Sequence, residues 1–364
     1  MRGAEAAKAF YMEPRLQREG AAPEPVQATL FGKGGVQQLD GAAHYARKAV
    51  FVSILVPENV ARLTRRIRRY WNRFDHWAPK RPRLPLYETA QHLLTLSVCE
   101  WLGLPVRDGN LAKLSADVAA LFNDAAGPGH LGARRARRRL ERWLAGLVED
   151  ARRARRREVA APLFRSLVEY REPETGELLP SRIVAVELLN LVRPVVAVSV
   201  YIVWMAHALL RCPDIRARLS RADSGYRKAF VEEVRRFYPF FPAVAARVSE
   251  PFSWREHRFE KDARVLLDLH GTNRCPRSWH EPDTFRPERF LNEPVDPYAF
   301  IPQGGGDVSQ GHRCPGEGVV VAIMLASLDF VSTHLPSAPS RLEDLAIGAQ
   351  RMPALPNKPI YIGR

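Results

Sequence analysis

The chain has few cysteines for its length, four among 364 residues, and no two of them stand in a C-x-x-C spacing. Cysteines scattered in this way argue against a disulfide framework and against a zinc site. They are typical of a protein from a reducing compartment. We therefore predict a cytoplasmic location, with the cysteines at positions 99, 212, 275 and 314 outside any disulfide framework.

Long hydrophobic runs are also missing. The first ten residues contain no sustained apolar region, so the sequence predicts neither a secretory signal nor a membrane anchor there. The most apolar segment, Pro194–Leu210, is short for a bilayer span and includes His207. We therefore interpret it as a buried core helix and expect no membrane span.

No Gly/Ser linker, repeat or polar tract divides the chain, so we expect one domain over residues 1–364. Apolar periodicity predicts mostly helix, whereas the apolar run Ala263–Leu269 predicts a strand. The fold class is therefore mainly α with a small β-sheet region. The clearest predicted helices are Ala4–Tyr11, Ala42–Leu55, Glu58–Asp75, Leu86–Leu102 and a long one over about residues 181–210.

Acidic residues are outnumbered, with 40 Asp and Glu against 55 Lys and Arg, for a net charge of +15. Two arginine clusters, Arg134–Arg139 and Arg152–Arg157, flank apolar residues at helical spacing, which predicts a helix with one packed face and charged ends. No helix-turn-helix, zinc finger or aromatic RNA-binding motif is present, so we expect no nucleic-acid partner. We interpret the charge as solvated surface; docking to an acidic partner or anionic surface is the alternative.

The most informative feature is Cys314, which stands near the end of a glycine-rich loop, Phe300–Gly316. Pro315 suits the first position of a helix, and the free N–H groups behind it direct partial positive charge at the sulfur. The apolar stretch Val319–Leu328 then predicts a buried helix. A loop of this kind can present a thiolate to haem iron, whereas a lone cysteine is otherwise more often a buried structural thiol.

The sequence Gly311-His312-x-Cys314-x-Gly316 resembles the cysteine loop of the cytochrome P450 superfamily, and within it the bacterial fatty-acid peroxygenase branch. The ordinary signature has Phe seven residues before the cysteine, where this chain has Asp307; its Phe300 lies further back, as in the longer peroxygenase loop. The resemblance implies a cytochrome P450 fold and haem b, with Cys314 as the iron ligand and His312 as a further cofactor-binding residue.

A second motif, Glu233 and Arg236 on one predicted helix face, resembles the Glu-x-x-Arg motif of the superfamily. The resemblance implies that this pair contacts Arg289 and braces the proximal side of the haem, which is a structural role. Without it, the pair would be an ordinary surface ion pair. A rival register, Glu232–Arg235, is open, but only Glu233 puts Pro239 where the family has its proline.

The dipeptide Arg193-Pro194 lies amid apolar residues of the predicted helix over residues 181–210. A proline inside a helix costs about 3 kcal/mol, and a buried guanidinium without a partner is also costly. Two interpretations follow. Arg193 either pairs with a nearby acid such as Glu187, or it binds a substrate carboxylate, which its planar fork matches.

At this point in the helix, oxygen-activating cytochromes P450 usually carry an acid–threonine pair, whereas the peroxygenase branch carries Arg-Pro. The resemblance therefore implies that Arg193 and Pro194 are catalytic, that hydrogen peroxide is the oxidant and that no redox partner is required. The fatty-acid carboxylate would act as the acid–base group while the α or β carbon is hydroxylated. The alternatives are a reductase-dependent monooxygenase and a non-catalytic haem- or anion-binding remnant of the family.

The segment Phe31–Gly41 resembles the distal loop of this branch. The resemblance implies that Phe31 and Gln37 bind the substrate, with Gln37 near its reacting end. Phe240 resembles an aromatic residue of the substrate pocket, and simple core packing is the alternative for it.

His44 and Lys48, four residues apart on a predicted helix, resemble haem-propionate ligands, and Arg18 does so more weakly. Without the resemblance, each would be interpreted as a solvated charge or a capping residue.

The resemblance runs from about Ala4 to Met324. Members of the branch have an additional N-terminal segment that carries the first strands of the sheet. We therefore expect the predicted strand Ala263–Leu269 to lack pairing partners and to leave an exposed edge. A misassigned start or a shortened form would explain the difference.

Overall fold

A computed structural model of the chain describes residues 1–77, 83–106, 109–154, 161–291, 294–309, 311–336, 346–348 and 353–363. Its helices are α1 (Ala4–Met12), α2 (Glu24–Val26), η1 (Gln27–Phe31), η2 (Val36–Gln38), α3 (Gly41–Ile54), α4 (Pro57–Asn72), α5 (Phe74–Trp77), α6 (Leu86–Leu102), α7 (Leu111–Asn123), α8 (His130–Arg153), α9 (Pro162–Val168), α10 (Ser181–Ala197), α11 (Ser199–Arg211), α12 (Pro213–Leu219), α13 (Ser224–Phe237), α14 (Leu269–Asn273), η3 (Pro287–Phe290) and α15 (Glu317–His334).

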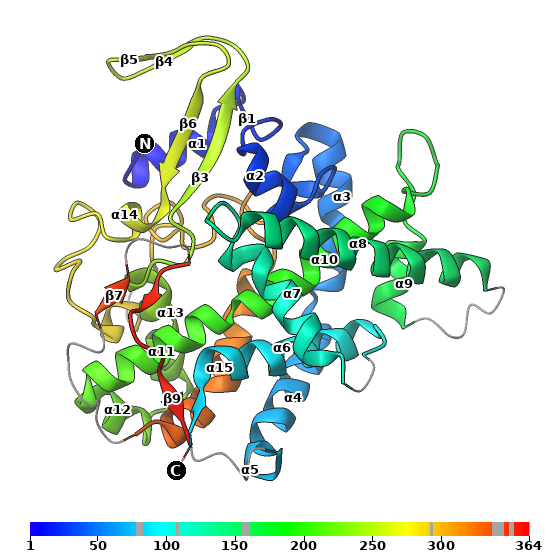
Figure 1. Cartoon of the computed structure of the whole chain (residues 1–364). Helices are drawn as coiled ribbons and strands as arrows, with labels where there is room; N and C mark the ends of the chain where they lie inside the picture. Colours follow the sequence, from blue (N-terminus) through cyan, green and yellow to red (C-terminus); the bar gives the residue numbers. More distant parts are fainter. Residues whose placement is uncertain are drawn as a thin grey trace.

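The strands are short and form small antiparallel sheets. One sheet has the order β1 (Leu16–Gln17), β3 (Ala243–Val248) and β6 (Arg264–Asp268). The other strands pair as β2 (Leu84–Pro85) with β9 (Tyr361–Ile362), β4 (Phe252–Trp254) with β5 (His257–Phe259), and β7 (Ile347–Gly348) with β8 (Leu355–Pro356). Figure 1 shows the helices as the main body, with the three-stranded sheet and the β4–β5 hairpin at one end, near the N-terminus. The predicted class, mainly helical with a small sheet, is confirmed.

Helices α10 and α11 form the centre of the helical core. Every side chain from Ser199 to Leu210 is buried, as are nearly all from Val184 to Ala197. Together they form an apolar stretch long enough to cross a membrane by length and composition, as does α15, but 89% of the apolar window in Ser181–Arg211 is buried inside the protein. The prediction of a core helix is therefore confirmed.

The break between α10 and α11 falls at Val198, four residues after Pro194. The N–H of Val198 bonds to the carbonyl of Val195 at 3.2 Å, three residues back, where a regular α-helix would use Pro194. The sequence predicts a single long helix here. The structure divides it by a local change of hydrogen-bond register, close to the proline that disturbs the ladder.

The basic helix α8 differs from its predicted form in one important residue. Leu140 and Leu144 are buried as expected, and Val148 is buried beside them. Arg137, from a cluster interpreted as solvated surface, is only 2% exposed. The predicted residues Arg155–Arg157 lie outside the described part of the chain.

Strand β6 is the predicted strand Ala263–Leu269, and it lies at the edge of its sheet. It pairs with β3 over five residues on one side. On its other side, the terminal amine of Met1 donates to the Leu266 carbonyl at 2.7 Å and the N–H of Asp268 donates to the Met1 carbonyl at 3.0 Å. The expectation that this strand lacks pairing partners is therefore wrong, because β6 pairs with β3, whereas its expected place at a sheet edge agrees with the structure.

The predicted pair on α13 is a fully buried ion pair. Arg236 donates to both carboxylate oxygens of Glu233, at 2.7 and 2.8 Å, and neither side chain is exposed. Arg289 donates to the same carboxylate at 3.3 Å, and the backbone N–H of Arg286 does so at 2.7 Å. Arg236 also donates to backbone carbonyls beyond α14, among them Pro282 at 2.9 Å. The pair thus fixes the segment between α14 and η3 to α13.

The rival register on α13 also forms a buried network, which the sequence did not predict. Arg235 is 2% exposed and forms ion pairs with both Glu232 and Glu317, the first residue of α15. It also donates to the side-chain oxygen of Gln303 at 2.7 Å. Because Gln303 and Glu317 stand on the two sides of Cys314, Arg235 joins both ends of the cysteine loop to α13.

Replacing Arg236 by Met should lower the free energy of unfolding by about 3–5 kcal/mol, because Glu233 would then remain as an uncompensated buried charge. Urea unfolding followed by circular dichroism measures this change.

Arg258→Met is the matched control, because Arg258 and Glu260 form an exposed pair with side-chain exposures of 69% and 65%. This substitution should change the free energy of unfolding by only about 0–1 kcal/mol. Equal effects of the two substitutions would contradict the assignment of Glu233 and Arg236 as the buried brace.

Candidate functional site

Cys314 is held just before α15 by bonds within its own loop. Its N–H donates to the Gln303 carbonyl at 3.1 Å. Burial raises the pKa of Cys314, whereas the backbone N–H of Gly316 and the charges of Lys48 and Arg193 act in the opposite direction. The thiol therefore lies beside the helix start, as predicted, and within the electrostatic reach of two cations from distant parts of the chain.

Four basic side chains gather beside the cysteine loop, and all four belong to the predicted cofactor-binding set: Arg18, His44, Lys48 and His312. The rings of His44 and His312 lie 4.0 Å apart between centroids. Lys48 donates to the carbonyls of Gly311 and Arg313, the latter at 2.9 Å. His44 and Lys48 are 5% and 3% exposed, which rules out the interpretation of either as a solvated charge.

Burial and mutual repulsion act strongly on this cluster. Burial lowers the pKa of Lys48 to about 8. Burial, with the charges of His312 and Lys48, lowers the pKa of His44 to about 3. Two carboxylates act on them: Asp40 contacts His312 at 3.1 Å and accepts from the N–H of Arg18 at 2.8 Å, and the charge of Asp307 acts on Lys48. The cluster therefore has more basic groups than acidic ones.

Arg18 shows most directly that this cluster has a donor without an acidic partner. Its guanidinium stacks on the ring of Phe10 at 4.4 Å, and its buried Nη1 has no hydrogen-bond partner among the described residues. Its side chain does not pair with Asp40, which instead accepts from its backbone N–H. A buried donor without an acceptor costs about 1–3 kcal/mol, so an acidic ligand would stabilise it.

Arg193 lies in the apolar core and is 7% exposed. It donates to the carbonyl of Leu30, and its guanidinium lies 5.9 Å from the centroid of the Phe31 ring. No carboxylate of the described residues forms an ion pair with it. Burial, and then the charge of Arg137, lower the pKa of Arg193 to about 9. The predicted cation is therefore buried, close to Phe31 and without an acidic partner.

The alternative in which Arg193 pairs with Glu187 is wrong. Glu187 is fully buried, but its carboxylate binds Arg47 at 2.9 Å, the N–H of Val36 at 2.9 Å and the side-chain amide of Asn190 at 2.9 Å. These three donors occupy the one acid near Arg193 in sequence. Glu187 thus anchors α3 and η2 to α10 and leaves the arginine free of it.

Asn190 fixes the orientation of Gln37. Its Nδ2 donates to the Glu187 carboxylate and also to Oε1 of Gln37 at 3.0 Å. Because a carboxylate only accepts, the amide nitrogen of Asn190 must point that way, and Gln37 must then use its oxygen as the acceptor. The NH₂ group of Gln37 is therefore the end that remains for a ligand. The sequence motif did not indicate Asn190.

Two further predicted residues are placed less distinctively. Phe240 stacks on Tyr201, with centroids 4.4 Å apart, which agrees with core packing and leaves the pocket role a prediction. Pro194 lies inside α10 beside Arg193. Its role in catalysis also stays a prediction.

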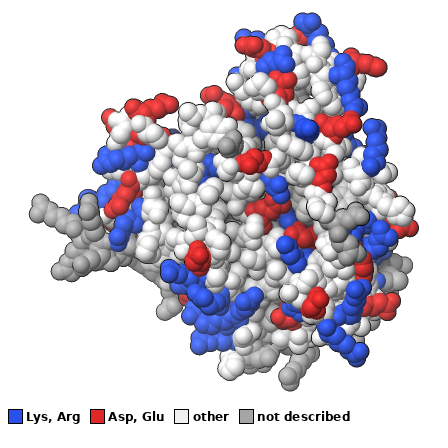
Figure 2. Space-filling view, turned by 180° about the vertical axis from the view of Figure 1, so that it is seen from behind, with Lys and Arg blue, Asp and Glu red and all other residues white. Residues whose placement is uncertain are grey.

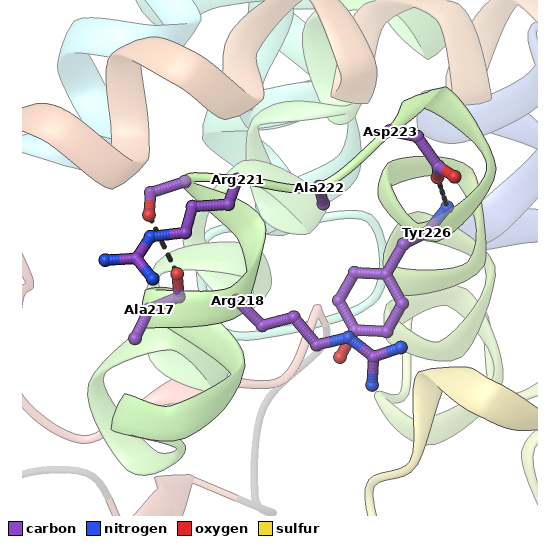
Figure 3. A pocket seen from close by; sticks show the side chains of 7 residues that line it. Ala217, Arg218, Arg221, Ala222, Asp223 and Tyr226 are labelled. Carbon is purple, nitrogen blue, oxygen red and sulfur yellow. Dashed lines mark hydrogen bonds between the residues drawn. The ribbon is translucent and has the colours of Figure 1, made fainter.

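A surface cavity of about 630 Å³ lies at the α12–α13 turn and includes none of the predicted residues. Figure 3 shows Arg218 beside the ring of Tyr226, and the hydrogen bond that the backbone N–H of Tyr226 donates to the carboxylate of Asp223. Arg218 also pairs with Glu288. Arg218 and Asp223 thus already have partners, and no cysteine lines this cavity.

The residues around Cys314 fit a haem. The sulfur stands beside a helix start, and a bound metal cation would favour its thiolate form. The surplus of basic groups at Arg18, His44, Lys48 and His312 suits the two propionates. Arg193 lies near enough to Cys314 to influence its pKa. Among the described residues no cluster of three or more His, Cys, Asp or Glu suits a metal ion.

Comparison with known proteins supports this assignment. The sequence model "Cytochrome P450" matches residues 199–328. Psoralen synthase from Pastinaca sativa is 30% identical over 175 residues, which cover 40% of this chain and 35% of the plant protein. The chain thus spans about a third of the length of this curated relative.

Solved structures match over the whole chain. Cytochrome P450SP alpha (CYP152B1) in complex with (R)-ibuprophen is 40% identical, with a TM-score of 0.94, covering 100% of this chain and 89% of that one. Cytochrome P450EX alpha (CYP152N1) with myristic acid is 39% identical, with a TM-score of 0.91, covering 100% and 88%. Such likeness implies haem b ligated by a cysteine thiolate. The chain therefore belongs to the cytochrome P450 family, among its CYP152 members.

Proposed function

We propose that the protein is a haem-thiolate peroxygenase that hydroxylates fatty acids at the α or β carbon with hydrogen peroxide. The observation that carries this proposal is Arg193, a buried guanidinium near Cys314 with no carboxylate partner among the described residues. A buried cation of this kind is costly unless a ligand neutralises it. The ligand that its planar fork matches is a carboxylate.

The two structures named above support this substrate class. One is a complex with (R)-ibuprophen and the other contains myristic acid, and both small molecules are carboxylic acids. A carboxylate bound to Arg193 would lie near Cys314, which leaves only the nearest carbons of the acyl chain in reach. Attack at the α or β carbon follows from this anchoring.

The chain's own residues would bind and orient the acid rather than move protons themselves. When bound, haem supplies the iron at which peroxide reacts, and the Cys314 thiolate donates electron density to it. The side chains next to Arg193 on α10, Pro194 and Val192, have no acid–base group. The carboxylate on Arg193 would accept a proton from one peroxide oxygen and deliver it to the other, which leaves as water while the remaining oxygen is transferred to the substrate.

Two other functions are the alternatives to this proposal. A reductase-dependent monooxygenase would use the same fold with electrons from a partner, and the basic surface would then dock that partner. A non-catalytic remnant would bind haem or anions without turnover. The proposed enzyme needs no redox partner and no nucleic acid, and we place it in the cytoplasm.

The first test concerns the axial ligand. Purified protein should bind haem b and show, when reduced under carbon monoxide, the red-shifted absorption band typical of thiolate ligation. Cys314→Ala should abolish this band, whereas Cys99→Ala should keep it. A band that survives Cys314→Ala and disappears with Cys99→Ala would refute the assignment of Cys314.

The second test concerns Arg193. Turnover of a fatty acid with hydrogen peroxide alone, measured by mass spectrometry of the products, should fall by at least ~10²-fold in Arg193→Ala, as is typical for the loss of a positioned acid–base group. Haem content should not change. Full turnover by this variant, or activity in the wild type only with a reductase and NAD(P)H, would overturn the peroxygenase proposal.

The third test replaces the head group of the substrate. The wild type should oxidise a small substrate without a carboxyl group only when a short carboxylic acid is added, because that acid would occupy Arg193 and transfer the proton. The rate should rise with the acid concentration and then saturate. Inhibition by the acid would contradict substrate-assisted activation.

The fourth test concerns Gln37, whose amide is a poor proton donor. Hydroxylated acids should therefore exceed alkenes among the products, and Gln37→His should raise the alkene share. Gas chromatography of the products from wild type and variant measures this ratio. Alkene as the main wild-type product would show that the role assigned to Gln37 is wrong.

A further inference from the structure

A small surface cavity of about 190 Å³ lies where α8 meets the segment around η1. Five basic side chains and one acidic side chain line it: Lys33, Arg134, Arg137, Arg138, Arg182 and Glu141. We call it the basic pocket. Figure 2 shows that on one face of the protein basic and acidic side chains are interspersed, with basic ones gathered in patches.

The acids near the basic pocket do not balance its cations. Glu141 pairs with Arg137 at 2.7 Å. Glu24 serves both Lys33 and Arg134, each at 3.2 Å. The remaining cations, Arg138 and Arg182, are exposed and take part in no ion pair among the described residues. The pocket therefore keeps an excess of positive charge that faces the solvent.

Arg137 connects the basic pocket to the site at Arg193. Its buried guanidinium lines the pocket and donates to the backbone carbonyls of Thr29, Leu30 and Phe31, at 3.1, 3.4 and 3.3 Å. Arg193 donates to the same Leu30 carbonyl. The backbone of residues 29–31 thus lies between the cations of the basic pocket and Arg193. The charge of Arg137 also contributes to lowering the pKa of Arg193.

Close packing at Gly32 brings α8 near α10 next to this backbone segment. Gly32 follows Phe31 with φ +81°, and a Cβ there would overlap the guanidinium of Arg137 and approach Cγ1 of Val186 to 2.8 Å. A side chain at this position would therefore push α8 away from α10. Glycine permits both the backbone conformation and the close approach.

The volume of the basic pocket limits its ligand. Small-molecule sites that enclose a whole ligand usually measure about 300–1,000 Å³, so a cavity of about 190 Å³ holds a head group and leaves an acyl chain outside. Guanidinium groups bind carboxylates with matching geometry. The carboxylate end of a fatty acid fits both this size and this charge.

We propose that the basic pocket is an outer carboxylate site, where the head group of the fatty acid binds before it reaches Arg193. This inference rests on the proposed function. Clusters of one charge beside an apolar site raise the association rate of an oppositely charged ligand by about 10–10³-fold, and the effect falls with ionic strength. The outer site therefore raises the rate of fatty-acid binding while Arg193 determines the bound position.

The experiment compares fatty-acid binding by the haem-loaded wild type and by Arg138→Glu/Arg182→Glu. Stopped-flow absorbance of the haem, at increasing sodium chloride, gives the association and dissociation rates for a saturated C14 acid. At low salt the variant should bind on the order of 10-fold more slowly, with a flatter salt dependence and a dissociation rate within about twofold of wild type. Arg138→Gln/Arg182→Gln should give an intermediate association rate.

Arg65→Glu/Arg68→Glu is the matched control, because both arginines are exposed on α4. It makes the same change in net charge on a helix that packs mainly on α15 and α6. At 0.1 M salt its association rate should stay within about twofold of wild type, because charges on another surface are then screened beyond about 10 Å. An equal loss in the control and pocket variants, or no loss in the pocket variant, would overturn the outer site.

A neutral ligand separates this inference from the proposed function. The corresponding fatty alcohol should bind at the same rate to wild type and pocket variant, with no salt dependence. If wild type converts the acid with peroxide but the pocket variant binds it normally, only the outer site fails. If wild type neither binds nor converts the acid, the proposed function fails and the outer site fails with it.

Discussion

The guanidinium of Arg193 is a permanent cation inside an apolar core, and the surrounding structure leaves it unneutralised. The nearest acid along the helix, Glu187, is fully committed to Arg47, the N–H of Val36 and Asn190. Burial, and then the charge of Arg137, lower the pKa of Arg193 to about 9. A free protein that keeps such a charge is selective for an anion, because a carboxylate removes most of the cost.

A similar imbalance recurs beside the cysteine loop, where it suits a different set of acids. Asp40 contacts His312, the charge of Asp307 acts on Lys48, and a nitrogen of Arg18 has no acceptor among the described residues. Basic groups with too few acidic partners therefore lie both at Arg193 and beside the cysteine loop. Arg193 belongs to α10, whereas His44 and Lys48 belong to α3 and contact the cysteine loop. Because the two groups stand on different elements, one fold can hold both the propionates of a cofactor and the head group of a substrate.

Much of the fold and of the site was predictable because the relevant residues stand in short, spaced motifs. Helical periodicity predicted α6 with its bounds, Arg289 contacts Glu233 as expected, and Cys314 stands just before a helix as expected. What escaped prediction depends on contacts across the fold. Arg137 belongs to an arginine run typical of solvated surface, yet α8 turns it onto the carbonyls of η1. No local pattern distinguishes this arginine from its exposed neighbours.

The two registers on α13 show why motif spacing alone was insufficient there. Consecutive residues of a helix point about 100° apart, so Glu232–Arg235 and Glu233–Arg236 address different neighbours. One pair meets η3 through Arg289, and the other meets the cysteine loop through Gln303 and Glu317. The sequence analysis treated the two registers as rivals, of which one would be the brace. In the structure the double Glu-Glu-x-Arg-Arg sequence connects a single helix to both segments, so that the position of Cys314 and that of the Arg289 segment are fixed by adjacent residues.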